Sequence, residues 1–172
     1  MSAIRSRKAA CEVIVMTCTN EDDKAVLGVI KALARRDEDK FKAGYVDDLA
    51  WTCDTSIPGM TYYLFAAIQK DPETGISDVC GFAKVYKGGS YPVEIDVIAS
   101  KAETDREMYA GVGTLLIKKI VSYFKQEAKR SPEEEITGIY VHAQPAALPF
   151  YLKVGFKRIG SAMSRNLFLS FE

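Results

Sequence analysis

The sequence predicts one mixed α/β domain that spans residues 1–172. Short runs of β-branched and aromatic residues, bounded by turn-forming residues, predict strands. Longer stretches whose apolar residues recur every three to four positions predict helices. The order is a strand, a pair of helices, a meander of strands, a helix, a strand, a helix and closing strands. We therefore expect a sheet of about seven strands with about four helices.

The first part of the chain begins with a strand and continues as helices. The run at 12–17 is rich in β-branched residues, which favour a strand. Apolar residues at helical spacing predict a helix over 23–35, and Asn20 or Asp22 can cap it. A second, less regular helix is expected over 38–52.

An antiparallel meander is expected next. Strands are predicted over 60–69, 79–86 and 91–100 because each run is apolar or aromatic. The segments between them, 71–75 and 87–90, are rich in the residues that form turns.

The second half contains the longest amphipathic helix, which is predicted over 113–129. A polar connection, 101–106, leads towards it from the meander. The remaining elements are a strand, a short helix and two closing strands, at 136–143, 145–155, 156–159 and 166–171.

Composition excludes several classes of protein. Lys and Arg total 23 and Asp and Glu also total 23, so a general nucleic-acid binder, usually basic, is not expected. The apolar run at 13–16 is too short for a signal peptide or a membrane span, so no membrane partner is expected. The scattered cysteines, with one histidine, indicate reduced thiols in a cytoplasmic protein and no metal site. These cysteines are Cys11, Cys18, Cys53 and Cys80.

A glycine turn precedes the long helix. Gly111-Val112-Gly113 places backbone N–H groups at a helix start, where an anion such as a phosphate can bind. Such turns also occur in loops without a ligand. A dinucleotide site would need a third glycine where Leu116 stands, so we exclude that reading.

Four other side chains have both a structural and a functional reading. Glu94 and Asp96 are two residues apart on a predicted strand, which puts both on one face together with Ile98. They form either a solvated face or an acidic pair beside the glycine turn. Tyr151 is a core aromatic or a catalytic residue, and His142 is interpreted as structural.

Together these features resemble the GNAT superfamily of acyl-CoA-dependent N-acetyltransferases. Residues 94–117 look like the family's strand four, pyrophosphate loop and third helix, with Gly111 and Gly113 matching. Residues 144–156 look like its fourth-helix motif, which contains Tyr151.

Two residues depart from that pattern. Met108 stands where the family loop usually has Arg or Gln, while Arg106 is close but out of register. Gln144 replaces the usual Asn of the fourth-helix motif. The first departure concerns side-chain contacts in the loop, not capture of phosphate by the backbone.

The resemblance implies a sheet splayed between strands four and five, with acetyl-CoA as co-substrate and no metal. The pantetheine arm would pair with strand four, the pyrophosphate would lie on the glycine loop, and the adenine end would lie near 144–153. The implied cofactor-binding residues are Ile98, Ala99, Ser100, Met108, Tyr109, Ala110, Gly111, Val112, Gly113, Thr114, Gln144, Ala147, Phe150 and Lys153.

The resemblance also implies direct attack of an amine on the acetyl thioester. Tyr151 would be the general acid, and Glu94 or Asp96 the base. Glu94 matches protein-lysine acetylating relatives, whereas Asp96 lies nearer the acid of polyamine-acetylating relatives, so the choice stays open.

The acceptor expected from this resemblance is a small cationic amine, polyamine-like in character. A protein lysine or N-terminal amine is the alternative, and a non-catalytic acyl-CoA sensor is another. A homodimer is one option for the oligomeric state.

Overall fold

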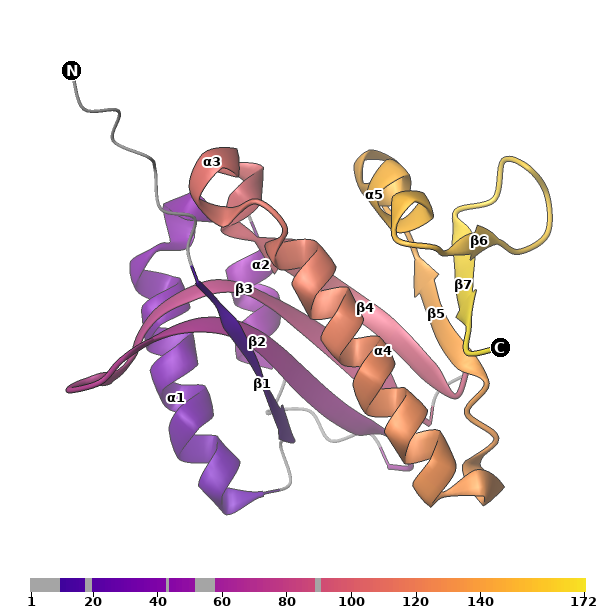
Figure 1. Cartoon of the computed structure of the whole chain (residues 1–172), viewed down its shortest axis with the longest axis horizontal. Helices are drawn as coiled ribbons and strands as arrows, with labels where there is room; N and C mark the ends of the chain where they lie inside the picture. Colours follow the sequence, from indigo (N-terminus) through magenta and orange to yellow (C-terminus); the bar gives the residue numbers. More distant parts are fainter. Residues whose placement is uncertain (1–9, 18–19, 43, 52–57, 89–90) are drawn as a thin grey trace.

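The computed structural model describes residues 10–17, 20–42, 44–51, 58–88 and 91–172. Seven strands form one sheet in the order β1-β2-β3-β4-β5-β7-β6, with helices on both faces (Figure 1). Neighbouring strands are antiparallel except β4 and β5, which are parallel. The predicted mixed α/β fold with a mostly antiparallel sheet is confirmed.

The observed elements follow the predicted order. The strands are β1 (Glu12–Thr17), β2 (Thr61–Asp71), β3 (Gly75–Lys87), β4 (Val93–Ser100), β5 (Gly138–His142), β6 (Lys157–Arg158) and β7 (Asn166–Ser170). The helices are α1 (Glu21–Arg36), α2 (Tyr45–Trp51), α3 (Arg106–Tyr109), α4 (Val112–Arg130) and α5 (Leu148–Lys153). None of these described helices is long and apolar enough to cross a membrane.

Two predicted segments differ from the structure. The helix expected over 38–52 is divided into a 3-10 turn, Glu38–Lys40, and α2, because Phe41 is extended and Gly44 has a φ of 89°. Its expected last residue, position 52, lies outside the described residues, as do positions 89–90 of a predicted turn. The polar connection over 101–106 contains a 3-10 turn and the start of α3.

Helix α1 begins where the sequence places a cap. The Asn20 side chain accepts a hydrogen bond of 3.0 Å from the Asp22 backbone N–H, so Asn20 is the cap and Asp22 is not. The helix buries Leu27, Ile30 and Ala34 against the sheet. Its apolar face therefore matches the periodicity of the sequence.

Each face of the sheet has its own core. On one face, α4 packs Leu116 and Phe124 against Phe65 of β2. On the other face, α1 packs Ile30 against a core that includes Leu64 of β2. Neighbouring residues of β2 thus serve opposite cores, as strand geometry requires.

Strand β4 contains a β-bulge at Asp96. Val85 of β3 is paired with Ile95, and the preceding Lys84 is paired with Val97, so Asp96 is the extra residue. The bulge reverses the alternation of side chains along β4. Before the bulge, the odd-numbered residues, such as Ile95, face α4. After the bulge, the even-numbered Ile98 faces α4 instead.

The bulge corrects one expectation for this strand. Glu94 and Asp96 do share a face, the α1 side of the sheet. Glu94 is next to Ile95, which faces α4, so Glu94 faces the other side. Asp96 forms an ion pair with Lys84, which faces the α1 side because its neighbour Val85 faces α4. Ile98 was expected beside them but packs on the α4 side. The period-two argument fails at Ile98 because it assumes an unbroken strand.

The parallel pairing of β4 with β5 is short. It includes only the Glu94–Tyr140 and Ile95–Val141 pairs. Beyond them the strands diverge towards the end of the molecule where α3 and α5 lie (Figure 1). The expected splay between strands four and five is therefore present.

Lys101, immediately after β4, is completely buried. Its Nζ lies 2.8 Å from Asp37 Oδ2 and 2.6 Å from Asp78 Oδ1. The Nζ also lies 5.6 Å from the ring centroids of Phe41 and Tyr109. This Lys101 cluster joins the end of α1, strand β3 and the loop before α4.

One carboxylate of the Lys101 cluster, that of Asp37, is held in its charged form. Hydrogen bonds from Arg36, Lys101 and Lys40 hold the pKa of Asp37 well below its usual range. The Tyr109 hydroxyl donates to Asp78 Oδ2 at 3.2 Å. A buried ammonium is tolerated here because two carboxylates and two rings surround it.

Replacing Lys101 with Met should lower the free energy of unfolding by about 3–5 kcal/mol, because two carboxylates lose their buried partner. Urea denaturation followed by circular dichroism measures this loss. The control Lys119→Met changes an exposed lysine of α4 and should stay within about 0.5 kcal/mol of the unaltered chain. A loss below about 1 kcal/mol for Lys101→Met would contradict the role given to the cluster.

Candidate active site

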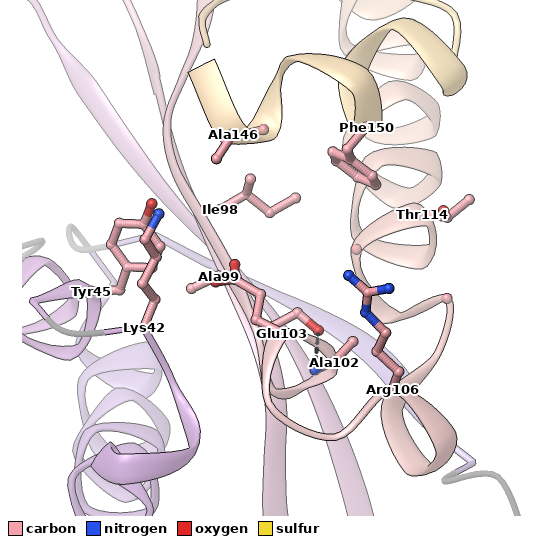
Figure 2. A pocket seen from close by; sticks show the side chains of 14 residues that line it. Lys42, Tyr45, Ile98, Ala99, Ala102, Glu103, Arg106, Thr114, Ala146 and Phe150 are labelled. Carbon is pink, nitrogen blue, oxygen red and sulfur yellow. Dashed lines mark hydrogen bonds between the residues drawn. The ribbon is translucent and has the colours of Figure 1, made fainter. Parts of the chain in front are cut away.

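A cavity of about 490 Å³ opens where β4 and β5 diverge. Figure 2 shows Phe150 and Ala146 on one side of it, with Lys42 and Tyr45 on another. It is lined by Lys42, Tyr45, Ile98, Ala99, Ser100, Ala102, Glu103, Arg106, Gly111, Gly113, Thr114, Ala146, Ala147 and Phe150. The sequence motifs at 94–117 and 144–156 thus meet at one cavity.

The first turn of α4 forms one wall of the cavity. Gly111 has a φ of 86°, a left-handed conformation that glycine adopts without steric cost, and α4 starts at the next residue. No side chain caps this helix start and no acidic residue lies in its first turn. Its backbone N–H groups and helix dipole are therefore free to bind an anion.

Gly113 allows α4 and α5 to approach closely. A Cβ atom at Gly113 would lie 3.2 Å from the Phe150 ring, which is tighter than most Cβ contacts, so the ring would have to shift slightly. The two residues come from the two sequence motifs. Gly113 therefore has two effects: it leaves the backbone of the first turn of α4 uncovered, and it lets the Phe150 ring form the adjoining wall of the cavity.

The charged residues at the cavity include some that the sequence interpretation did not select. The Arg106 side chain extends towards the cavity from the start of α3 (Figure 2). Met108, which occupies the expected Arg or Gln position, is 44% exposed and does not line the cavity. Asp105 accepts the Met108 backbone N–H at 3.0 Å, so that donor is already used.

Of the fourteen expected cofactor-binding residues, a first group lines the cavity: Ile98, Ala99, Ser100, Gly111, Gly113, Thr114, Ala147 and Phe150. A second group does not: Met108, Tyr109, Ala110, Val112, Gln144 and Lys153. Tyr109 instead bonds to Asp78, and Val112 is buried in the α4 core. Contact of any of these residues with a cofactor stays a prediction.

Several lining residues were missed by the sequence interpretation: Lys42, Tyr45, Ala102, Glu103, Arg106 and Ala146. Arg106 had a visible signal, because it is a cation just ahead of the glycine turn. Lys42 and Tyr45 come from the segment before and within α2. Nothing local in the sequence connects that segment with the glycine turn.

Tyr151 lies in α5, only 3% exposed, between two other rings. Ring centroids of Phe150 and Phe156 lie 5.2 Å and 5.3 Å from its own. Burial raises the pKa of the Tyr151 hydroxyl, and the neighbouring Tyr45 adds to that shift. Tyr151 itself does not line the cavity, although its ring neighbour Phe150 and the more distant Tyr45 both do.

The two candidate bases have different surroundings on the α1 side of the sheet. Asp96 Oδ2 lies 3.1 Å from Lys84 Nζ, which in turn lies 5.4 Å from the Tyr62 ring centroid. Glu94 forms no ion pair with any residue in the described part of the chain. Neither carboxylate lines the cavity. Both face the α1 side of the sheet, whereas α4 and its glycine turn pack on the other side.

His142 connects two strands. Its Nδ1 lies 2.6 Å from Asn166 Oδ1, which also accepts the Tyr140 hydroxyl at 2.9 Å. These bonds tie β5 to β7 and agree with the structural interpretation of His142. In the described ranges, no group of three or more His, Cys, Asp or Glu residues is arranged to bind a metal.

The cysteines are free where the structure describes them. Cys80 is buried and Cys11 is partly buried, and neither is in a disulfide. Cys18 and Cys53 lie outside the described residues.

Comparison with known proteins identifies the family that this arrangement resembles. Residues 103–171 match the family described as "Acetyltransferase (GNAT) domain". The chain resembles the GNAT acetyltransferases in fold and in sequence motif. A comparison with curated protein sequences finds no match.

Two solved structures show the extent of this GNAT-like fold. One is GCN5 of Tetrahymena, with a TM-score of 0.52 and 12% identity, covering 95% of this chain and 97% of that one. Another is an acyl-CoA N-acyltransferase of Pseudomonas aeruginosa, with a TM-score of 0.55 and 13% identity, covering 94% of this chain and 100% of that one. The similarity of fold therefore extends well beyond residues 103–171, to most of the chain.

We predict that this cavity binds the phosphates of coenzyme A, and that replacing Arg106 with Gln weakens the binding about tenfold because a charge-assisted bond would be lost. Isothermal titration calorimetry measures the dissociation constant. Arg130→Gln is the matched control, since Arg130 lies at the far end of α4, paired with Glu127. Equal affinities for the two variants would mean that Arg106 does not contact the ligand.

Proposed function

We propose that this GNAT-like chain transfers an acetyl group from acetyl-CoA to the primary amine of a small cationic acceptor, polyamine-like in character. The observation that supports this most is the placement of groups about β4. The glycine turn at the start of α4 lies on the α4 side of β4, whereas Glu94, which forms no ion pair with a described residue, faces the α1 side. Tyr45, which packs on the α1 side, also lines the cavity. A co-substrate and an acceptor could thus meet at the splay from opposite faces.

The residues of the cavity fit coenzyme A. Gly111 and Gly113 expose the backbone of the first turn of α4, while Arg106 and Lys42 add positive charge. These residues would bind the phosphates, and β4 near Ile98 would hold the pantetheine arm. Bound acetyl-CoA supplies an electrophilic thioester carbonyl.

Glu94 is the favoured base. A primary amine with a pKa near 10.4 is cationic at pH 7, and deprotonating it there costs roughly 4–5 kcal/mol. A carboxylate that accepts the proton, directly or through water, reduces that cost. The Asp96 carboxylate is already paired with Lys84, whereas Glu94 has no such partner among the described residues, so Glu94 is better suited to accept the proton.

Tyr151 is the proposed general acid. The amine nitrogen bonds to the carbonyl carbon, the carbon–sulfur bond breaks, and the departing sulfur takes the phenolic proton of Tyr151. The raised pKa keeps the phenol protonated until that moment. The acylated nitrogen gives up its second proton through water, and water returns a proton to the tyrosine, which leaves a neutral amide and the coenzyme A thiol.

Replacing Tyr151 with Phe, or Glu94 with Gln, should each reduce turnover by about a hundredfold or more, because each removes a proton-transfer group. Release of the coenzyme A thiol, with spermidine as acceptor, measures turnover. Asp96→Asn is the matched carboxylate control and should cost less than about tenfold. If Asp96→Asn costs more than Glu94→Gln, the base has been assigned to the wrong residue.

The same assay tests the other activities that a GNAT-like chain could have. Acetylation of a lysine peptide but of no small amine would replace the proposed acceptor. Tight binding of acetyl-CoA with no thiol release for any amine would instead indicate a sensor.

The rate of acetyl transfer should rise with pH and show no fall up to about pH 10, the ordinary pKa of tyrosine. The rise reflects deprotonation of the amine. The raised pKa of Tyr151 keeps its hydroxyl protonated above the pH at which an ordinary tyrosine would lose its proton. A pH profile of kcat measures this, and a descending limb centred below pH 9 would exclude Tyr151 as the acid.

A further inference from the structure

A row of aromatic residues crosses the α1 side of the sheet at the level of Glu94. Tyr62 is paired with Tyr86, Tyr86 with Glu94, and Glu94 with Tyr140. The residue next to each on its strand packs into the opposite, α4-side core, so these four side chains share the other face. Glu94 is thus the one carboxylate within a row of tyrosines.

The rings form two contacting pairs, one on each side of Glu94. The centroids of Tyr62 and Tyr86 are 5.9 Å apart. Tyr91, from the segment before β4, stacks on Tyr140 with centroids 3.7 Å apart and an interplanar angle of 8°. Tyr91 is 37% exposed, so the stack reaches the surface.

Glu94 interacts electrostatically with the tyrosines on both sides. Burial raises the pKa of Tyr86, and a hydrogen bond to Glu94 and the Glu94 charge add to the shift. Burial and Tyr91 raise the pKa of Tyr140, with Glu94 again contributing. The carboxylate therefore lies near both phenols, yet no described lysine or arginine pairs with it.

The chain itself shows how such surroundings hold an alkylammonium group. One step further along the same face, Lys84 Nζ lies 3.1 Å from the Asp96 carboxylate and 5.4 Å from the Tyr62 centroid. A carboxylate and a tyrosine ring together thus hold a primary ammonium there. The surroundings of Glu94 repeat this chemistry without a cation from the described chain.

We propose that Glu94, with the rings of Tyr86 and Tyr140, binds the primary ammonium group of the acceptor. The carboxylate supplies the counter-charge, and the aromatic rings attract the cation and pack against its alkyl chain. The bound ammonium would then lie beside the base that deprotonates it, and this consequence rests on the proposed function.

The charges on this face define the class of acceptor further. Lys84 neutralises Asp96, so Glu94 is the carboxylate of the pair left to bind a ligand. One ammonium group is therefore enough for recognition. The site should bind a simple monoamine such as butylamine and also the terminal ammonium group of a polyamine. An alcohol of the same length lacks the charge and is not bound.

The test is an NMR titration of the full chain with butylamine at pH 7, in the absence of acetyl-CoA, with butan-1-ol as the uncharged comparison. Tyrosine ring signals should shift with butylamine only. Tyr86→Leu and Tyr140→Leu should each weaken binding about tenfold, whereas Tyr86→Phe and Tyr140→Phe, which keep the ring, should bind within about twofold of the unaltered chain.

Thermal melting shows which leucine variant is folded, and either one suffices for the comparison. Equal shifts with butylamine and butan-1-ol would overturn the proposal, as would unchanged affinity in a folded leucine variant. Selective binding of butylamine without thiol release from acetyl-CoA would leave this site standing and remove the proposed transferase activity. Thiol release with an unchanged KM for butylamine in both leucine variants would leave the transferase activity standing and remove the proposed ammonium site.

Discussion

The interaction on which the rest of the structure depends is the buried ion pair of Lys101 with Asp37 and Asp78. Its three members come from the loop after β4, the end of α1 and strand β3. A buried charge is costly unless it is fully paired, so the three segments must stay in contact for the fold to be stable. The cavity lies beside this contact, since Ser100 and Ala102, the neighbours of Lys101, both line it. The loop that leads to α4 is thereby held against the segment that carries Lys42 and Tyr45.

Strand β4 separates the two halves of the candidate site. Its pairing with β5 ends after Ile95, and the bulge at Asp96 turns the following residues over. As a result Ile98 faces the cavity side, while Glu94 faces the row of tyrosines on the other side. In the proposed function the cofactor and the acceptor would therefore contact different faces of this strand, which suits a reaction that joins two ligands.

The sequence predicts much of this fold because many of its signals are local. The periodicity of α4, the Asn20 cap and the glycine turn each depend on residues close in the chain. What it could not predict depends on distant partners. Lys101 looks like an ordinary surface lysine until Asp37 and Asp78 are brought to it. Likewise the face of Ile98 depends on how β3 pairs with β4, and the tyrosine row exists only after β2 to β5 align.

The bulge also has a consequence for how this protein can evolve. Substitutions along β4 alter one surface at a time, so the two faces of the strand can diversify independently. A deletion of one residue at Asp96 would be different, because removing the extra residue restores simple alternation. The side chains of β4 that follow the deleted residue would then all point to the opposite face of the sheet. We expect the length of this strand to be far less variable among descendants than its composition.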